Sequence, residues 1–156
     1  MKYFLDFETS HNQFYIIDEA YQKNVPSYNF WNTEAFSYRL AVEEGIVGVL
    51  TLSYGHIKGE IKILDKENDL IDFIKYDHIV EGGLDVKSGI LQVIDCPTSK
   101  VSCQIKLEPG LYRIRIYSSG FKDTDMDEME SNDYYIIEIW PGKALERKIL
   151  KQMPKT

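Results

Sequence analysis

Hydrophobic and polar residues alternate along several stretches of this chain, and this period of two constrains its fold more than any other feature. In the segment LYRIRIY, the apolar positions Tyr112, Ile114 and Ile116 fall on one face of an extended chain, opposite Arg113 and Arg115. Because successive side chains of a strand point to opposite faces, this pattern predicts half-buried β-strands. The same alternation recurs in three further segments, 56–64, 101–107 and 133–140.

Five more segments combine β-branched or aromatic residues with flanking turn signals and are expected to form strands: 2–8, 12–18, 48–53, 73–80 and 89–95. Gly and Pro mark the predicted turns: 54–56, 81–83, 87–89, 97–100 and 108–110. One-sided alternation with short loops is typical of antiparallel sheets with one solvent-exposed face. About eight to nine such strands bury their apolar sides when two sheets pack together. The sequence therefore predicts an all-β fold, an antiparallel two-sheet β-sandwich; a flattened barrel fits the same alternation.

One short helix is expected within NTEAFSYRLAVEEG, residues 32–45. Asn32 or Thr33 is a suitable N-cap, and Gly45 is a suitable terminator. Phe36 and Leu40 would then face the core from this helix.

The chain of 156 residues is most simply one domain with a tail. Residues 1–142 are expected to form the β-sandwich domain, and residues 143–156 a basic C-terminal tail, which is marginal as an isolated helix or else lies extended along the sandwich. The tail holds five basic residues and one acid, so a formal net charge of −7 for the chain leaves about −11 on residues 1–142. An acidic body attracts basic partners and accelerates their encounter at low salt.

Other bulk features exclude several classes of protein. Net negative charge argues against nucleic acid as a partner, since binding to phosphates needs clustered Lys and Arg. No apolar run approaches the roughly 20 residues that span a bilayer, and Asp6 and Glu8 interrupt any secretory signal. We therefore expect a cytoplasmic protein that needs neither a membrane nor a cofactor. Cys96 and Cys103 are expected to be free thiols on the two arms of a hairpin, with Cys103 opposite Ile94.

The acidic segment FKDTDMDEMESNDYY, residues 121–135, lies between two predicted strands. Asp123, Asp125 and Asp127 match the first alternate ligands of a calcium-binding EF-hand loop, but Glu128 and Tyr134 occupy positions that need Gly and Glu. Three interpretations remain open for this segment: a solvated loop, a docking surface for a basic partner, and a weak calcium site.

Catalytic motifs are not found in the sequence, and we expect no enzyme and no metal site. There is no nucleophile elbow and no phosphate-binding loop. His11, His56 and His78 lack the short spacings to a second His or Cys that are typical of zinc sites.

Arg113 and Arg115 allow two interpretations. On the exposed face of a central strand they would pair with carboxylates of a neighbouring strand, with Glu138 as a candidate. Alternatively, the two arginines, Glu138 and Trp140 would form a polar and aromatic patch for a ligand or protein, with Trp140 as the anchor.

Four stretches in this order resemble the competence protein J family: SHNQFYIID, EAFSYRLAVEEGIVGVLTLS, LEPGLYRIRIYSSG and DYYIIEIWP. They also resemble related bacterial sandwich proteins of immunity type. The first family implies a small bacterial inhibitor of a DNA-entry nuclease. This chain departs from that family in its acidic loop 122–133, in its tail after Pro141, and in one extra residue between His11 and Gln13.

The resemblance and the negative charge together predict an inhibitor or immunity protein that neutralises a basic nuclease or toxin. The residues expected to bind this partner are Asp123, Asp125, Asp127, Glu128, Glu130, Asp133, Tyr134, Trp140, Arg113 and Arg115. The main alternative is a small-molecule or carbohydrate-binding β-sandwich that presents Tyr112, Tyr117 and Tyr134 on a concave face. An assembly subunit with an exposed sheet edge and an unrecognised enzyme are further alternatives.

Overall fold

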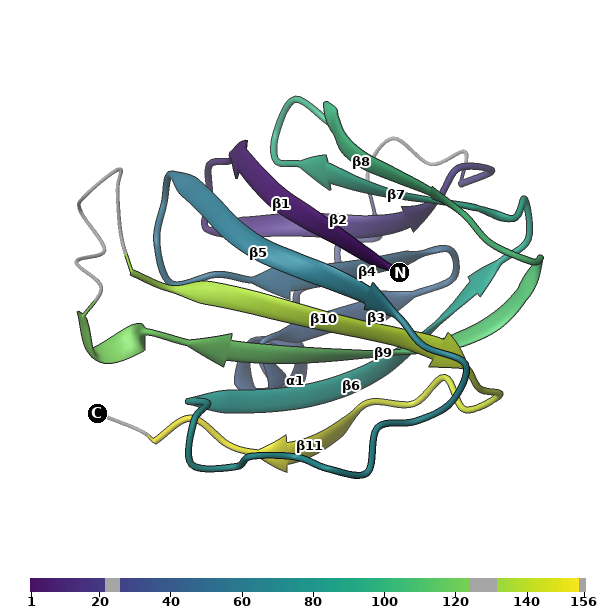
Figure 1. Cartoon of the computed structure of the whole chain (residues 1–156). Coiled ribbons are helices and arrows are strands. Elements are labelled where there is room, and N and C mark those ends of the chain that lie inside the picture. The colour runs from purple at the N-terminus through teal and green to yellow at the C-terminus, as the bar shows by residue number, and fades with distance from the viewer. Residues whose placement is uncertain (22–25, 124–131, 155–156) are drawn as a thin grey trace.

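Two β-sheets pack face to face in the computed structural model, which describes residues 1–21, 26–123 and 132–154 (Figure 1). Sheet A has six strands in the order β1 (Lys2–Glu8), β5 (His56–Ile63), β10 (Tyr134–Pro141), β9 (Gly110–Ser119), β6 (His78–Val86) and β11 (Lys148–Lys151). Sheet B has five strands in the order β3 (Leu40–Glu43), β4 (Ile46–Leu50), β2 (Gln13–Asp18), β7 (Ile90–Asp95) and β8 (Val101–Lys106). This confirms the predicted all-β sandwich. The pairing is antiparallel except between β5 and β10, which run parallel.

The core lies between the two sheets and follows the predicted alternation. Ile114 of β9 and Ile137 of β10 are fully buried from sheet A, where they meet Phe14 and Ile16 of β2 from sheet B. Burial of such side chains contributes about 1.5–3 kcal/mol each. No helix in the described ranges is both long enough and apolar enough to cross a membrane.

The predicted turn at 81–83 is wrong, because β6 continues through it to Val86. Strand β6 also begins at His78 and not at residue 73. Its two glycines permit close approach from both faces of the sheet. A Cβ on Gly82 would lie 2.9 Å from Leu40, and a Cβ on Gly83 would lie 2.5 Å from the backbone oxygen of Ala144.

The helix is shorter than predicted. Helix α1 spans Thr33–Tyr38, with Asn32, one of the two expected residues, as its N-cap, and it ends where Arg39 adopts a left-handed conformation. The following residues form β3, so Leu40 reaches the core from a strand. Gly45 belongs to the β3–β4 turn, where its φ of 78° suits glycine. Phe36 is exposed, and Ala35 is the buried residue of α1.

Both cysteines are free thiols, as predicted. The hairpin register differs from the expected one, because Cys103 pairs with Val93 and Val101 pairs with Ile94. A bulge between Val93 and Ile94 shifts the register by one residue.

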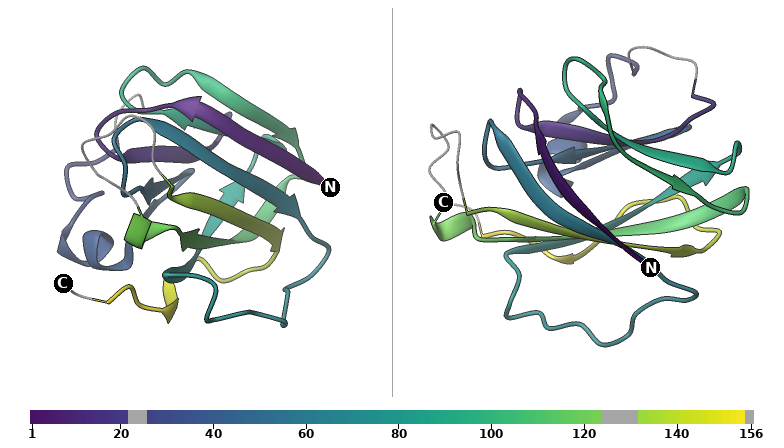
Figure 2. Two further views of the ribbon diagram at one scale, coloured as in Figure 1. Left: turned by 60° about the vertical axis from the view of Figure 1, so that its left-hand side comes forward. Right: turned by 45° about the horizontal axis from the view of Figure 1, so that its top comes forward.

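The outer face of sheet A is covered, contrary to the expectation of an open polar face. The segment between β5 and β6, residues 64–77, crosses this face, and the segment from Pro141 into β11 lies beside it (Figures 1 and 2). Arg115 is consequently 1% exposed and Arg113 8% exposed. Residues 148–151 of the basic tail pair with β6 as the last strand of sheet A.

His78 attaches the end of the described chain to the sandwich. Its Nδ1 accepts a hydrogen bond of 3.0 Å from the Met153 amide, so the neutral ring donates from Nε2 to the Tyr38 carbonyl at 2.8 Å. Burial lowers the pKa of His78, and the nearby Arg39 lowers it further, although the bond to Tyr38 opposes both. Protonation would place a second proton on Nδ1 and remove the acceptor that holds Met153.

The free energy of unfolding should therefore fall in mild acid. The unfolded chain binds a proton at His78 near pH 6.5, whereas the folded chain does so only at a lower pH. The stability that neutral His78 contributes is complete above about pH 6.5 and is lost as the pH falls towards the pKa of His78 in the folded chain. His78→Gln should flatten the pH dependence measured by urea unfolding between about pH 7.5 and 5.5. An unchanged slope in His78→Gln would contradict this role.

Candidate partner-binding region

Two arginines of β9 share one glutamate of β6 on the outer face of sheet A. Glu81 lies directly opposite Arg115, and Arg113 lies opposite Gly83, where no side chain stands in its way. Arg115 donates from Nε to Oε2 of Glu81 at 2.7 Å, and Arg113 donates from Nη2 to Oε1 at 3.1 Å. All three side chains are buried. Each carboxylate oxygen of Glu81 therefore has its own charged partner, which offsets part of the cost of burying the three charges.

Glu138 of β10 lies opposite Arg115 on its other side. The Arg115 Nη1 atom is 3.6 Å from Oε1 of Glu138, and it donates a hydrogen bond of 2.9 Å to the hydroxyl of Tyr117. Tyr117 in turn donates its hydroxyl proton to Glu138. This confirms the prediction that the arginines pair with carboxylates of neighbouring strands.

Burial and neighbouring groups determine the protonation states of Tyr117 and Arg115 in this cluster. Burial raises the pKa of Tyr117 well above its ordinary value, and its hydrogen bond to Glu138 raises it further. Burial lowers the pKa of Arg115, but the hydrogen bonds that it donates to Tyr117 and Glu81 outweigh this effect and leave that pKa raised. Tyr117 thus stays a hydrogen-bond donor and Arg115 stays cationic at neutral pH. The cluster is suited to holding structure and not to proton transfer.

Trp140 belongs to the same cluster. The Arg115 guanidinium lies 4.9 Å from the centre of its ring, a cation–π contact, and Trp140 is 5% exposed. The structure places Trp140 and both arginines beneath covering segments, so they support this face from within.

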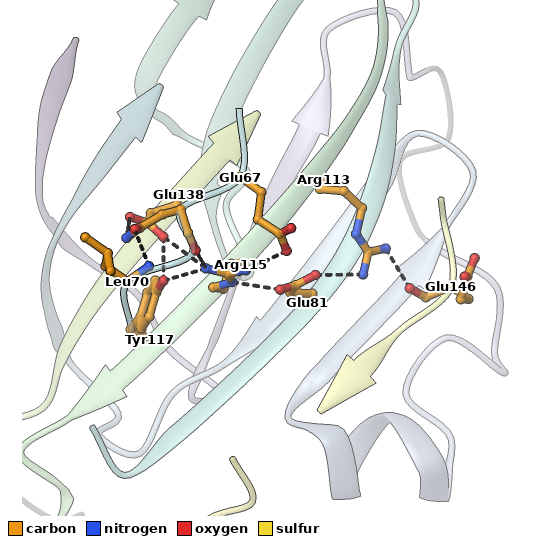
Figure 3. A network of polar contacts seen from close by, with 9 residues as sticks. Glu67, Leu70, Glu81, Arg113, Arg115, Tyr117, Glu138 and Glu146 are labelled. Carbon is orange, nitrogen blue, oxygen red and sulfur yellow. Dashed lines mark hydrogen bonds and ion pairs between the residues drawn. The ribbon is translucent and has the colours of Figure 1, made fainter. Parts of the chain in front are cut away.

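Arg115 holds the segment that covers it. Its Nη1 donates to the backbone oxygen of Asn68 at 2.8 Å, and its Nη2 donates to Oε1 of Glu67 at 2.9 Å (Figure 3). The Asn68 side chain donates to Oε2 of Glu138 at 3.0 Å. We call residues 64–77 the β5–β6 loop; its first half is thus bonded directly to the centre of sheet A.

Arg113 fixes the other covering segment in the same way. Its Nη1 donates to the backbone oxygens of Ala144 at 3.0 Å and Glu146 at 2.7 Å. Further along, Arg147 donates to the carbonyl of Leu40 at 3.0 Å. The two buried arginines thus connect sheet A to two separate stretches of chain.

Most of the predicted acidic surface lies outside the described residues. This holds for Asp125, Asp127, Glu128 and Glu130, and with them for the interpretation as a calcium site. Asp123 ends the short 3-10 helix Phe121–Asp123, and of Asp123 itself only the backbone is described.

Asp133 and Tyr134 differ in their surroundings. The Asp133 carboxylate is buried and accepts hydrogen bonds from the Ser53 hydroxyl at 3.0 Å and the Tyr135 hydroxyl at 2.6 Å. It is therefore an internal acceptor that connects β10 to the segment after β4. Tyr134 is half-buried at the start of β10, where it packs beside Tyr117 and Ile136 on the outer face.

The three tyrosines expected to line a concave ligand face do not share one face. Tyr112 points into the core between the sheets, whereas Tyr117 and Tyr134 belong to the cluster on the outer face of sheet A. Strand alternation separates positions 112 and 117, which differ by an odd number of residues. This part of the small-molecule interpretation is wrong.

Histidines and acids form no metal-binding cluster of three or more ligands among the residues that the structure describes. His56 pairs with Asp6 across β5 and β1, and His78 holds the Tyr38 and Met153 backbone.

Four residues of the cluster were missed from the sequence: Glu67, Asn68, Glu81 and Tyr117. Two glycines follow Glu81, so the sequence there predicts a turn, and it presents Tyr117 only as an aromatic residue. The one available signal was the arginine pair itself, since two adjacent same-face charges in a central strand require carboxylate partners.

Two solved structures share this fold, although no family model and no curated protein matches the sequence. ComJ from Bacillus subtilis, an inhibitor of the DNA-degrading activity of NucA, superposes with a TM-score of 0.69 at 16% identity, over 91% of this chain and 98% of ComJ. The product of crocagin biosynthetic gene J superposes with a TM-score of 0.57 at 17% identity, over 92% and 99% of the two chains. The resemblance to the competence protein J family is thus confirmed at the level of the fold.

Glu81→Gln should destabilise the fold strongly, because it leaves two buried guanidinium groups without their shared carboxylate. The expected loss is about 3–5 kcal/mol in the free energy of unfolding. Glu44→Gln is the control, since Glu44 pairs with Lys87 at an exposed site and its loss should cost less than about 1 kcal/mol. Urea unfolding measures both variants, and equal losses would contradict the central place of Glu81.

Proposed function

We propose that this chain is an inhibitor or immunity protein that binds and neutralises a basic nuclease or toxin in the cytoplasm. The observation that carries the proposal is the likeness of fold to the nuclease inhibitor ComJ along nearly the whole of both chains. At 16% identity this likeness supports a similar kind of activity and leaves the identity of the target open.

The charge of the chain supports the same proposal. Residues 1–142 carry a formal charge of about −11. Nucleases bind phosphates through basic clefts, so an acidic protein of this size is attracted to them and associates quickly at low salt.

The proposed binding region is the end of sheet A from which the acidic segment 122–133 emerges. Asp123, Asp125, Asp127, Glu128 and Glu130 would supply negative charge there, with Tyr134 at its edge. Arg113, Arg115, Trp140 and Asp133 would act from within, by holding the strands and loops that present this surface.

The proposal is tested by capture followed by a DNA-degradation assay. The tagged chain is mixed with lysate and culture medium of its own organism at low and moderate salt. Retained proteins are identified and assayed on labelled double-stranded DNA with increasing amounts of the chain. We expect a basic protein whose DNA-degrading activity falls to near zero at an equimolar amount of the chain. Recovery of DNA-degrading proteins that remain fully active would contradict the proposal.

A variant with neutralised acids tests the contribution of the acidic segment to binding without changing the buried residues of the fold. It carries Asp123→Asn, Asp125→Asn, Asp127→Asn, Glu128→Gln and Glu130→Gln, and it retains Asp133 because that carboxylate is buried. The association rate with the captured partner should fall by about tenfold or more at low salt and differ little at high salt. An unchanged association rate would remove the acidic segment from the binding surface.

A further inference from the structure

Three large apolar side chains lie exposed within five consecutive residues of the β5–β6 loop. Leu70 is 90% exposed, Ile74 is 93% exposed and Phe73 is 46% exposed. Single exposed apolar residues are ordinary, but a group of three on one loop is typical of an interaction surface. The loop projects from the outer face of sheet A, away from sheet B, as the right-hand view of Figure 2 shows.

Other apolar side chains of the same loop are packed against the sheet. Its Ile71 and Tyr76 turn towards the sheet and pack with Tyr117 of β9 and Ile136 of β10. The rings of Tyr76 and Tyr117 are 4.8 Å apart. The loop therefore has an inner side that packs on the sheet and an outer side that carries its most exposed apolar groups.

The backbone of the loop is held at several points. Arg115 bonds the Asn68 carbonyl, and the Asn68 side chain accepts from the Leu70 amide at 3.0 Å. Lys151 of β11 donates to the carbonyl of Phe73 at 2.6 Å. A surface that is already ordered in the free protein loses less conformational entropy on binding.

Charge identifies the kind of partner that fits this surface. The loop contains five carboxylates and two lysines, a formal charge of −3. Asp69 precedes Leu70, Asp72 precedes Phe73 and Lys75 follows Ile74, so acids outnumber bases beside the exposed apolar residues. An apolar centre with an acidic rim complements a partner that offers an apolar patch surrounded by Lys and Arg.

We propose that the outer side of the β5–β6 loop, with Leu70, Phe73 and Ile74 at its centre, is a docking surface for a basic nuclease. The inference rests on the proposed function and adds the surface that supplies apolar contact. In this arrangement the acidic segment 122–133 accelerates the encounter, and the loop slows dissociation.

The test compares two exposed-residue variants with the wild type on the nuclease captured by the wild-type chain. The double variant Leu70→Ser/Ile74→Ser removes the two most exposed groups of the loop. Tyr28→Ser is the matched control, because Tyr28 is 94% exposed and lies elsewhere on the chain. The amount of each chain that halves DNA cleavage is measured, together with dissociation rates and melting temperatures.

We expect the double variant to need about 30-fold or more protein for half-inhibition, with the loss mainly in a faster dissociation rate. Tyr28→Ser should stay within about twofold of the wild type, and both variants should melt within a few degrees of it. If the wild type inhibits and the double variant inhibits equally well, the docking surface is overturned while the proposed function stands. If the wild type inhibits no nuclease, both are overturned.

A second copy of this chain is the competing occupant of the surface. Size-exclusion chromatography of the wild type and the double variant decides this point. A wild-type monomer supports the nuclease as occupant. A wild-type dimer that the double variant converts to a monomer would overturn it.

Discussion

The buried guanidinium of Arg115 is the interaction on which the outer half of this structure depends. A cation that is 1% exposed needs partners on every side, and here they come from β6, β10 and the β5–β6 loop. Satisfying the charge therefore fixes the positions of a neighbouring strand, of Tyr117 and of a loop distant in sequence. The cost of burying this cation largely offsets the stability that its ion pairs contribute. Its main contribution is to select one arrangement of the chain above the sheet.

The two faces of sheet A therefore differ in composition and in what they hold in place. The inner side is an apolar core of the ordinary kind, while the outer side is a polar platform that orders two covering segments. One of these segments, the β5–β6 loop, is held from below and leaves Leu70 and Ile74 to solvent. The proposed inhibitor thus combines an ordered apolar surface with a strongly acidic body, two features suited to binding a protein that itself binds phosphate.

Local patterns predicted the strands well where one face alone is buried, as in β5, and they predicted the N-cap Asn32. They failed where the deciding contact is distant in sequence. Residues Leu40–Glu43 continue the helical pattern of α1 in the sequence, but they pair with β4 as strand β3. The pair Gly82–Gly83 has the sequence of a turn, but it lies within β6 and allows other segments to approach that strand closely. The candidate region was partly found through Arg113 and Arg115. Their burial was not foreseen, because alternation cannot reveal that another stretch of chain covers the polar face.

The central claim is that the β5–β6 loop is ordered by the network beneath it before any partner binds. Amide hydrogen exchange of the free protein tests this most directly, in peptides that cover residues 68–76. The account predicts exchange at least about tenfold slower than in an unstructured chain of the same sequence. Exchange at the unstructured rate across these residues would contradict it, since a loop held by Arg115 and Lys151 cannot be open most of the time.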